Sequence, residues 1–418
     1  MVQHLADRFR HARILMYSHD TFGLGHLRRC RTIAHALVER FKGLHVLIVS
    51  GSSIAGAFEF RTRVDFVKIP SVIKLINGEY TPLARHTDLH ATLALRRSII
   101  QSTAESFEPD LFIVDKEPLG LRGELESTLT LLKTRGTMLV LGLRDVMDSA
   151  SRLAEEWAPN DVLRKMEALY DAVWVYGPAD FHDPLTGLAV SSPLRSRLAW
   201  TGFLRREVPV HANGIAGRLP TGALLVTAGG GGDGVDLMRQ VVAAYEADPS
   251  LTCPVVMVLG PFMKVEEREE MHRRAARLPA IHLLTFDNRL ETLMQDASAV
   301  VAMGGYNTFC EILSLDKPAL IVPRVRPREE QLIRARRAAD LGLVEMMLPD
   351  EARDPHRLAA ALHGLPSRPR PSETAYGQFT GEAGPLGGLD RIGDLVHGYV
   401  AARQAPLLKV LAGGRVDA

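Results

Sequence analysis

The feature that most constrains the fold is an alternation between short apolar runs and longer amphipathic stretches along most of the 418-residue chain. Strands of a parallel sheet read as continuous apolar runs because helices cover both faces of the sheet. The order therefore predicts parallel α/β sheets. The expected strands are residues 12–18, 44–50, 64–69, 111–114, 138–143, 172–176, 223–227, 255–259, 282–284, 299–302 and 319–322, and helix-like windows are 27–41, 89–106, 236–247 and 329–341.

The chain is also too long for one ordinary domain, since compact domains usually hold about 100–200 residues. Residues 205–221, RREVPVHANGIAGRLPT, interrupt the alternation with two prolines and two glycines and are interpreted as a linker. Two stretches, 14–26 and 224–235, each join a strand to a glycine-rich turn and a helix. Ligands of α/β sheets bind beyond the carboxyl ends of the strands, so both turns should face one cleft. The predicted division is a first domain over 1–205, a linker over 206–221, a second domain over 222–386, and a C-terminal helix and tail over 387–418.

Composition excludes several classes of function. The 50 basic and 49 acidic residues nearly cancel, and no global field draws the chain to nucleic acid. Three scattered cysteines without a CxxC motif argue against a disulfide framework or a cysteine-based zinc site. No run approaches the roughly 20 apolar residues of a membrane span. We therefore expect a cytoplasmic protein.

The segment at residues 70–82, PSVIKLINGEYTP, carries apolar side chains in what reads as a loop. Two interpretations remain open. The side chains pack onto the first domain, which we favour, or they form an exposed surface for a lipid or an acceptor. The second interpretation would place the protein at the inner face of a membrane as a peripheral protein.

The first candidate site follows the first expected strand, in the segment YSHDTFGLGHLRRC over residues 17–30. Gly23 and Gly25 allow close approach of the backbone, and His26 falls at the start of the next helix. The partial positive charge of a helix N-terminus disfavours the imidazolium form. A neutral His26 could accept a proton near neutral pH. The alternative is that His26 only caps or packs the helix.

Two carboxylates follow strands of the same domain and are further catalytic candidates. Asp115 comes directly after the strand at 111–114, and Asp145 comes just after the strand at 138–143. Acids at these positions reach the ligand side of the sheet, where they could orient His26 or bind an acceptor. Helix capping is the alternative role.

The second candidate site is the glycine-rich turn TAGGGGDG at residues 227–234. Such a turn exposes backbone N–H groups with no side chain in the way, which suits a diphosphate. A flexible turn without a ligand is the alternative. We leave Asp233 out of the site, because its carboxylate would repel a diphosphate. The candidate residues are Gly229, Gly230, Gly231 and Gly232.

The third candidate site is the segment MGGYNTFCEILSLDKPALIVP over residues 303–323, followed by REEQ at 328–331. Glu311 is expected one turn into a helix, where a carboxylate can accept from both hydroxyls of a ribose while the helix N-terminus faces phosphate. Gln331 opens the following helix and can donate to and accept from sugar hydroxyls. The residues at the turn and helix start are Gly304, Gly305, Asn307 and Thr308.

These segments resemble those of a known superfamily. GGYNTFCEILSLDKPALIVPR with the downstream EEQ resembles the donor-site signature of GT-B glycosyltransferases, including the lipid-linked N-acetylglucosaminyltransferase of peptidoglycan synthesis and the galactolipid synthases. GLGHLRRC resembles the GxGHxxR element of that superfamily, and the GxGHxxRC of nucleotide-sugar hydrolases and spore-coat polysaccharide proteins. The likeness follows the order of almost the whole chain. It implies a GT-B fold of two Rossmann-like, doubly wound domains that face each other across a cleft.

The resemblance also implies roles for individual residues. Glu311 would hold the ribose of a nucleotide sugar, Gln331 the donor sugar, and backbone near Phe286 the base. His26 matches the histidine that acts as a catalytic base in the hydrolases. The glycines 229–232 would contact the diphosphate, and Gly305, Asn307 and Thr308 would line the phosphate side. Gly25 and Gly304 are further donor-binding candidates.

The function that follows is transfer of a sugar from a nucleotide diphosphate sugar, expected to be UDP-linked, to a hydroxyl acceptor such as a lipid or glycan. Inversion without a metal or other cofactor is expected, and no DxD motif occurs. Two alternatives stay open. One is a nucleotide-sugar hydrolase in which His26 activates water, and the other is a nucleotide-sugar-binding protein without catalysis.

Overall fold

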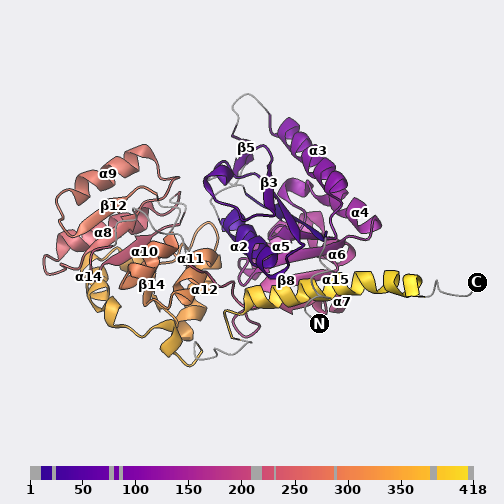
Figure 1. The fold of residues 1–418 in the computed structure, drawn as a ribbon. Helices are drawn as coiled ribbons and strands as arrows, with labels where there is room; N and C mark the ends of the chain where they lie inside the picture. The colour runs from indigo at the N-terminus through magenta and orange to yellow at the C-terminus, as the bar shows by residue number, and fades with distance from the viewer. Residues whose placement is uncertain are drawn as a thin grey trace, which may run out of the picture.

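The computed structural model describes residues 11–20, 25–74, 80–83, 88–208, 219–229, 232–286, 290–376 and 384–412. Within these ranges the chain forms two parallel sheets that lie side by side, each covered by helices (Figure 1). Their strands are almost entirely buried because apolar side chains meet helices on both faces. The predicted α/β class with two doubly wound domains is confirmed.

The first domain contains a seven-stranded sheet of described residues. In spatial order its strands are β3 (Val64–Lys68), β2 (His45–Ser50), β1 (Arg13–Ser18), β6 (Leu111–Asp115), β7 (Met138–Arg144), β8 (Ala172–Tyr176) and β9 (Leu198–Trp200). Its helices are α2 (Gly25–Arg40), α3 (Leu89–Phe107), α4 (Glu126–Thr134), α5 (Ala150–Trp157), α6 (Val162–Leu169) and α7 (Ser192–Arg195). The strand order reverses between β1 and β6, and a sheet of this kind binds ligands at such a switch point.

The second domain contains a six-stranded sheet of described residues. In spatial order its strands are β12 (Ile281–Leu284), β11 (Val255–Val258), β10 (Leu224–Thr227), β13 (Ala299–Ala302), β14 (Ala319–Ile321) and β15 (Glu345–Met346). Its helices are α8 (Val235–Ala247), α9 (Val265–Ala275), α10 (Leu290–Asp296), α11 (Tyr306–Ser314), α12 (Glu330–Asp340), α13 (Pro349–Ala352) and α14 (Pro355–Gly364). The switch point here lies between β10 and β13, from which the two glycine-rich turns leave.

Every expected strand is present, and its ends differ from the prediction by at most one residue. The interpretation of residues 70–82 as a loop is wrong in part. Strands β4 (Val72–Lys74) and β5 (Tyr80–Pro82) form a small antiparallel sheet there, and Val72 is buried. Residues 75–79 lie outside the described ranges. Strands of two or three residues, such as β4, β5 and β15, are too short to show a period in the sequence.

The C-terminal helix α15 (Gly388–Ala412) returns to the first domain and runs along it (Figure 1). Its residues Val396 and Ile392 are buried, and the ring of Tyr399 stacks on that of Trp174 with centroids 6.4 Å apart. Arg40 of α2 donates to the carbonyl of Asp390 at 2.9 Å. The helix therefore packs on the domain that begins the chain, although it follows the second domain in sequence.

Three phenylalanine rings fix the apolar part of the contact between the domains. Phe309 of α11 lies 5.4 Å from Phe203 and 5.8 Å from Phe181, measured between ring centroids. All three side chains are buried.

Most of the predicted linker, residues 209–218, lies outside the described residues. In the described ranges, no helix combines the length and apolar character needed to cross a bilayer.

Candidate active site

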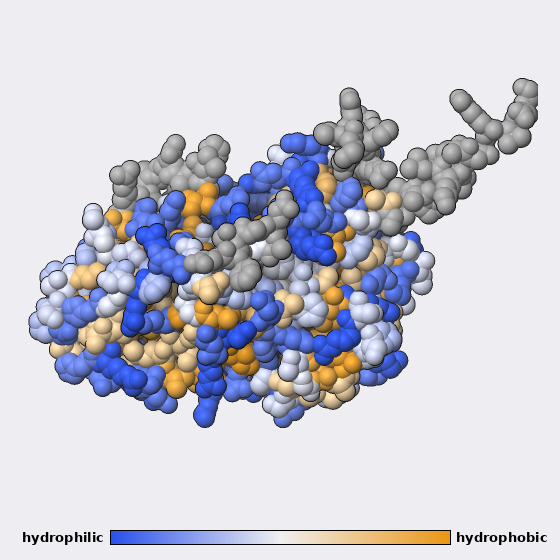
Figure 2. Space-filling view, turned by 90° about the horizontal axis from the view of Figure 1, so that it is seen from below, coloured by the Kyte–Doolittle hydropathy of each residue, from blue (hydrophilic) through white to orange (hydrophobic). Residues whose placement is uncertain are grey.

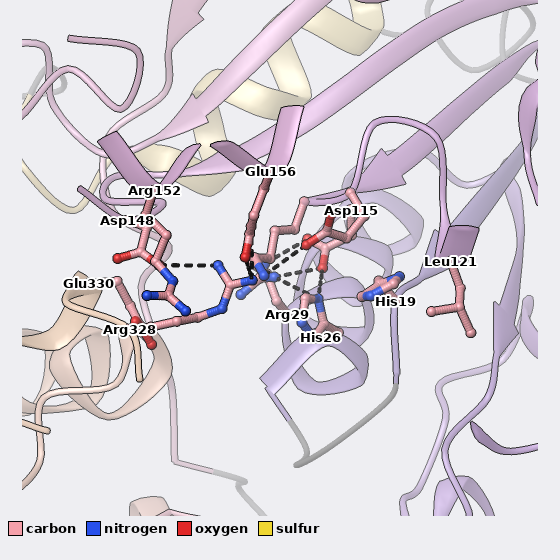
Figure 3. Close-up of polar contacts among 12 residues, drawn as sticks. His19, His26, Arg29, Asp115, Leu121, Asp148, Arg152, Glu156, Arg328 and Glu330 are labelled. Atoms are coloured by element: carbon pink, nitrogen blue, oxygen red, sulfur yellow. Dashed lines mark hydrogen bonds and ion pairs between the residues drawn. The ribbon is translucent and has the colours of Figure 1, made fainter. Parts of the chain in front are cut away.

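His26 and Asp115 meet at the switch point of the first sheet. His26 is the second residue of α2, which follows β1, and Asp115 ends the neighbouring strand β6. The Nδ1 atom of His26 lies 2.6 Å from Oδ2 of Asp115 (Figure 3). Arg29, one turn further along α2, donates from Nε and Nη2 to the two Asp115 oxygens at 2.7 and 2.6 Å. The Asp115 carboxylate is 1% exposed, so these two partners replace the water it has lost.

This arrangement determines the charge states of both groups. Burial opposes ionisation of Asp115, but Arg29 and the His26 hydrogen bond hold its pKa well below its usual range. Burial also lowers the pKa of His26 to about 4, with Asp115 opposing the shift and Arg29 adding to it. An ionised carboxylate only accepts, so the proton of the neutral ring sits on Nδ1. The Nε2 atom keeps a free lone pair and can accept a proton.

The neutral imidazole agrees with the sequence prediction, but its main cause differs. We expected the helix N-terminus to disfavour the charged ring, whereas burial among other groups is the largest contribution. His26 keeps 16% of its side chain exposed, so the ring is not sealed off from a ligand. The structure thus brings two of the three predicted catalytic residues together.

Asp145, the third predicted catalytic residue, does not join them. Arg334 of α12 donates from Nε and Nη2 to its two oxygens at 2.7 and 2.6 Å, and from Nη1 to the carbonyl of Gly304 at 3.1 Å. Both charged side chains are almost fully buried. Asp145 therefore ties the first domain to the second, and the catalytic role predicted for it is not supported by its position. Its place just after β7 is as expected, but its side chain is held by the other domain.

Replacing Asp145 with alanine is expected to destabilise the protein by about 3–5 kcal/mol, because it leaves the Arg334 guanidinium buried without a counter-charge. Chemical unfolding monitored by circular dichroism measures the loss. The matched control is the double variant Asp145→Leu with Arg334→Met, which removes both charges and should cost much less. An Asp145→Ala variant as stable as the wild type would contradict the importance of this pair.

Several of the residues predicted to bind the donor lie at the switch point of the second sheet. Gly304 ends the segment after β13 with φ of +78°, and a Cβ there would approach Ile321 to 2.8 Å, so only glycine fits. Gly305 precedes the first turn of α11, which carries Asn307 and Thr308. Gly229, after β10, also has a positive φ of +64°.

The remaining predicted donor residues are placed as follows. Gly232 is exposed, and Gly230 and Gly231 lie outside the described residues. Phe286, beyond β12, is 39% exposed. Gln331 opens α12 and accepts from the backbone N–H of Arg324 at 3.0 Å. Arg324 also pairs with Asp233 at 2.5 Å, so the carboxylate that we left out of the site is held by a residue of the same domain.

Contacts from the first domain cover the predicted ribose and phosphate residues in this structure. Asn307 donates from Nδ2 to the carbonyl of Gly25 at 2.9 Å and accepts from Arg206 at 2.6 Å. Arg28 donates to Oε1 of Glu311 at 2.6 Å and to Oε1 of Glu291 at 2.7 Å. Glu311 is fully buried, so a ribose could reach its carboxylate only after Arg28 has moved away.

Arg28 is shared between the carboxylates of Glu291 and Glu311, and this leaves one oxygen of Glu311 without a hydrogen-bond donor. Its Oε2 atom is buried and has no hydrogen-bond partner. Burial raises the pKa of Glu311 to about 7, Arg28 opposes this shift, and the nearby Glu291 adds to it. The site therefore lacks one hydrogen-bond donor, which a proton or a ligand hydroxyl could supply.

Several residues of this region were missed by the sequence reasoning. Arg29 lies in the GLGHLRRC segment, three residues after His26, and this helical spacing places both on one face of α2. The spacing of His26 and Arg29 could therefore have identified Arg29 from the sequence. Arg28 bonds to Glu311, 283 positions away, and Arg206 bonds to Asn307, 101 positions away, and nothing local in the sequence indicates such partners. In the ranges that the structure describes, no three His, Cys, Asp or Glu side chains group as metal ligands.

The sequence of the second domain matches a known family. Residues 223–379 match the glycosyltransferase family 28 C-terminal domain. A curated relative from Acidothermus cellulolyticus is the UDP-N-acetylglucosamine–N-acetylmuramyl-(pentapeptide) pyrophosphoryl-undecaprenol N-acetylglucosamine transferase. It is 28% identical over 216 residues, which are 51% of this chain and 56% of the relative. The match therefore spans little more than half of that relative's length.

Solved structures extend the likeness to the whole fold. MurG of Acinetobacter baumannii superposes with a TM-score of 0.57 at 13% identity and covers 92% of this chain and 98% of its own. UGT71G1 of Medicago truncatula, solved in complex with UDP-glucose, superposes with a TM-score of 0.60 at 11% identity and covers 94% and 99%. At such identities the likeness concerns the fold. The chain thus has the two-domain GT-B fold, and its residues 223–379 match the glycosyltransferase family 28 C-terminal domain.

Proposed function

We propose that the protein transfers a sugar from a nucleotide diphosphate sugar to a hydroxyl group of an acceptor. The observation that carries this proposal is the His26–Asp115 pair, which lies at the switch point of the first sheet and presents a free Nε2 atom. The second domain matches a glycosyltransferase family over residues 223–379 and carries two glycine-rich segments next to its own switch point. A proton acceptor in one domain and an anion site in the other are the two parts that such a transfer needs.

In the proposed reaction, Nε2 of His26 takes the proton of the acceptor hydroxyl as its oxygen attacks the anomeric carbon. The bond from that carbon to the diphosphate oxygen breaks on the opposite face, and its electron pair leaves with the diphosphate. The configuration at the anomeric carbon is therefore inverted. Asp115 stabilises the imidazolium that forms and keeps its orientation. N–H groups at the start of α11 and in the glycine-rich turns stabilise the leaving charge, and neither a metal nor a cofactor enters the scheme.

The donor that we propose is UDP-linked. The name of the Acidothermus relative contains UDP-N-acetylglucosamine, and UGT71G1 was solved with UDP-glucose. Glu311 would bind the ribose once Arg28 has moved, Gln331 the sugar, and backbone near Phe286 the base. The residues proposed for the diphosphate are Gly25, Gly229, Gly230, Gly231, Gly232, Gly304, Gly305, Asn307 and Thr308.

For the acceptor we propose a lipid or glycan, reached from the cytoplasmic side with peripheral contact to the membrane. The named relative acts on an undecaprenol-linked substrate. Leu83, beyond β5, is 50% exposed, and Leu95 of α3 is 53% exposed on the same part of the first domain. Such side chains suit contact with lipid. On the face shown in Figure 2, apolar residues lie in small groups among hydrophilic ones.

Thermal unfolding in the presence of UDP-, GDP- and dTDP-sugars tests the donor. A ligand that binds only the folded state adds about 2.7 kcal/mol at a concentration of 100 times its Kd. We expect a UDP-sugar to give the largest rise in Tm, and release of UDP in the presence of lipid or glycan extracts to depend on both substrates. No rise in Tm with any of these nucleotide sugars would contradict the proposal.

Hydrolysis is the second candidate, because the free Nε2 atom of His26 could equally take a proton from water. Incubation of the bound donor without acceptor separates the two reactions. Rapid release of free sugar supports hydrolysis, whereas turnover that begins only when an acceptor is added supports transfer. Tight binding without turnover under either condition would indicate a nucleotide-sugar-binding protein.

A further inference from the structure

A second histidine lies beside His26 and has no part in the reaction described above. His19 follows β1 directly, and its ring meets that of His26 edge to face, with centroids 5.6 Å apart and planes at 75° (Figure 3). It is 5% exposed. His19 belongs to the same segment as His26, but it is not part of the GxGH motif, and no other feature of the sequence singled it out.

A buried hydrogen-bond network determines which nitrogen of His19 carries the proton. The hydroxyl of Tyr17 donates its only hydrogen to Oε1 of Glu124 at 2.6 Å, and Arg96 holds both oxygens of that carboxylate at 2.7 and 2.6 Å. Burial raises the pKa of Tyr17, so the hydroxyl keeps its proton. The contact of 3.3 Å between Tyr17 and Nδ1 of His19 must then run from the ring to the hydroxyl oxygen.

His19 consequently has the same form as His26. Its proton lies on Nδ1, its Nε2 atom bears a lone pair, and burial lowers its pKa to about 3, with Glu117 opposing and His26 adding to the shift. None of the hydrogen bonds of the described residues involves either Nε2 atom. Two neutral rings, packed edge to face, therefore each carry an acceptor nitrogen at the ligand side of the sheet. A ligand that displaces water from this pair must supply a donor to each nitrogen, because a polar atom that loses water without gaining a partner is costly.

We propose that His19 is an acceptor-binding residue and that the acceptor presents two neighbouring hydroxyls, as a carbohydrate or a polyol does. One hydroxyl donates to His26 and becomes the nucleophile, while the adjacent hydroxyl donates to His19. Hydroxyls on adjacent carbons lie close enough for each to reach one ring with a hydrogen bond of about 2.8 Å. This inference rests on the proposed function, since it names the substrate class of the same site.

Other acceptor chemistries fit the pair less well. A simple alcohol would leave the His19 nitrogen without a donor. A phosphate or carboxylate would place its own lone pairs against two lone pairs. Lys116 and Glu117, whose charges act on His19 in opposite directions, form an ion pair of 2.9 Å with each other, so this pair supplies no net charge to attract an ion. A site that hydrogen-bonds a hydroxyl discriminates against an analogue without it, because its own polar group is then left unpaired.

Small alcohols test the inference directly. With the donor selected by thermal unfolding, the wild-type protein should transfer sugar to glycerol and 1,2-propanediol about 10- to 100-fold faster than to 1-propanol and 1,3-propanediol. Mass spectrometry of the glycosides measures each rate. His19→Phe, which keeps a ring but removes the acceptor nitrogen, should bring the rates close together, and His19→Gln, which restores an acceptor, should recover part of the preference. Donor affinity should be unchanged in both variants.

Three results would overturn the inference. They are equal rates for all four alcohols in the wild type, a preference that survives in His19→Phe, or transfer to none of them by a protein that binds the donor. Long-range ¹H–¹⁵N NMR of the imidazoles gives an answer that needs no nucleotide. We expect an unprotonated Nε2 in His19 that shifts when glycerol is added, and a proton on Nε2 would refute the argument. Failure of every nucleotide sugar to bind would instead contradict the proposed function.

Discussion

Replacing His26 with glutamine is expected to lower kcat by about 10²–10⁴ while leaving the affinity for the nucleotide sugar almost unchanged. The amide cannot accept the acceptor's proton, so the attacking oxygen must lose it to water. His26 lies in the first domain and bonds to Asp115, whereas the residues proposed for the donor lie mostly in the second domain. Nucleotide release at saturating donor, together with calorimetric titration of the donor, measures the two quantities separately.

Two further variants make this experiment specific. Asp115→Asn should lower kcat comparably, because an amide can donate to Nδ1 and leave the proton on the wrong nitrogen. His35→Gln is the matched control, since His35 lies on the same helix α2 and its Nε2 accepts from the backbone of Arg61, away from the site. It should turn over as the wild type does. Equal losses of donor affinity and kcat in His26→Gln would remove His26 from the chemistry.

Replacing Glu311 with alanine is expected to weaken binding of the nucleotide by about 10- to 100-fold. Hydrogen bonds to a charged group contribute roughly 1.5–3 kcal/mol, and Glu311 is proposed to accept from the ribose hydroxyls. Calorimetry with UDP and with 2′-deoxy-UDP checks the assignment. The wild type should prefer UDP, and Glu311→Ala should bind both nucleotides alike. A variant that retains the preference for UDP would show that the ribose binds elsewhere.

The same carboxylate should make donor binding depend on pH. The pKa of Glu311 is about 7 because it is buried and lies near Glu291, with Arg28 opposing the shift. Its ionised form is the better acceptor for two hydroxyls, so binding releases a proton from the protonated fraction. Affinity for a UDP-sugar should therefore fall as the pH drops below about 7 and level off above it. Glu311→Gln should abolish this dependence, and Glu291→Gln should move it to lower pH because Arg28 then pairs with Glu311 alone.

Much of the fold could be predicted because its central strands are buried on both faces. Strands such as β6 and β13 are continuous apolar runs, a pattern that few other structures produce. Two short edge strands, β9 and β15, escaped prediction for the opposite reason. β9 is only half-buried and three residues long, and β15 has two residues, so neither has a distinctive composition. The return of α15 to the first domain also could not be predicted, because a modest apolar face does not specify its partner.

The candidate site, like the fold, could be predicted only in part. Asp115 and Asp145 looked equivalent in the sequence, since each follows an apolar strand of the first domain. The structure distinguishes them by their partners. Arg29 and His26 come from α2 and meet Asp115, whereas Arg334 comes from the second domain and meets Asp145. The role of each carboxylate therefore depends on which arginine, distant in the sequence, pairs with it: Arg29 for Asp115 and Arg334 for Asp145.

The sequence by itself determined the two parallel sheets, the glycines that follow β1, β10 and β13, and the presence of a histidine where α2 begins. These are local properties, set by the burial of apolar runs and by the backbone freedom of glycine. Only the tertiary structure decided that His26 pairs with Asp115, that His19 lies beside it with the same free nitrogen, and that Arg28 covers Glu311. The first and third relations join residues far apart in the chain, and the second depends on a network that reaches Glu124. Packing, burial and charge pairing therefore act on them only in the folded chain, and in the case of Arg28 and Glu311 only once the two domains have met.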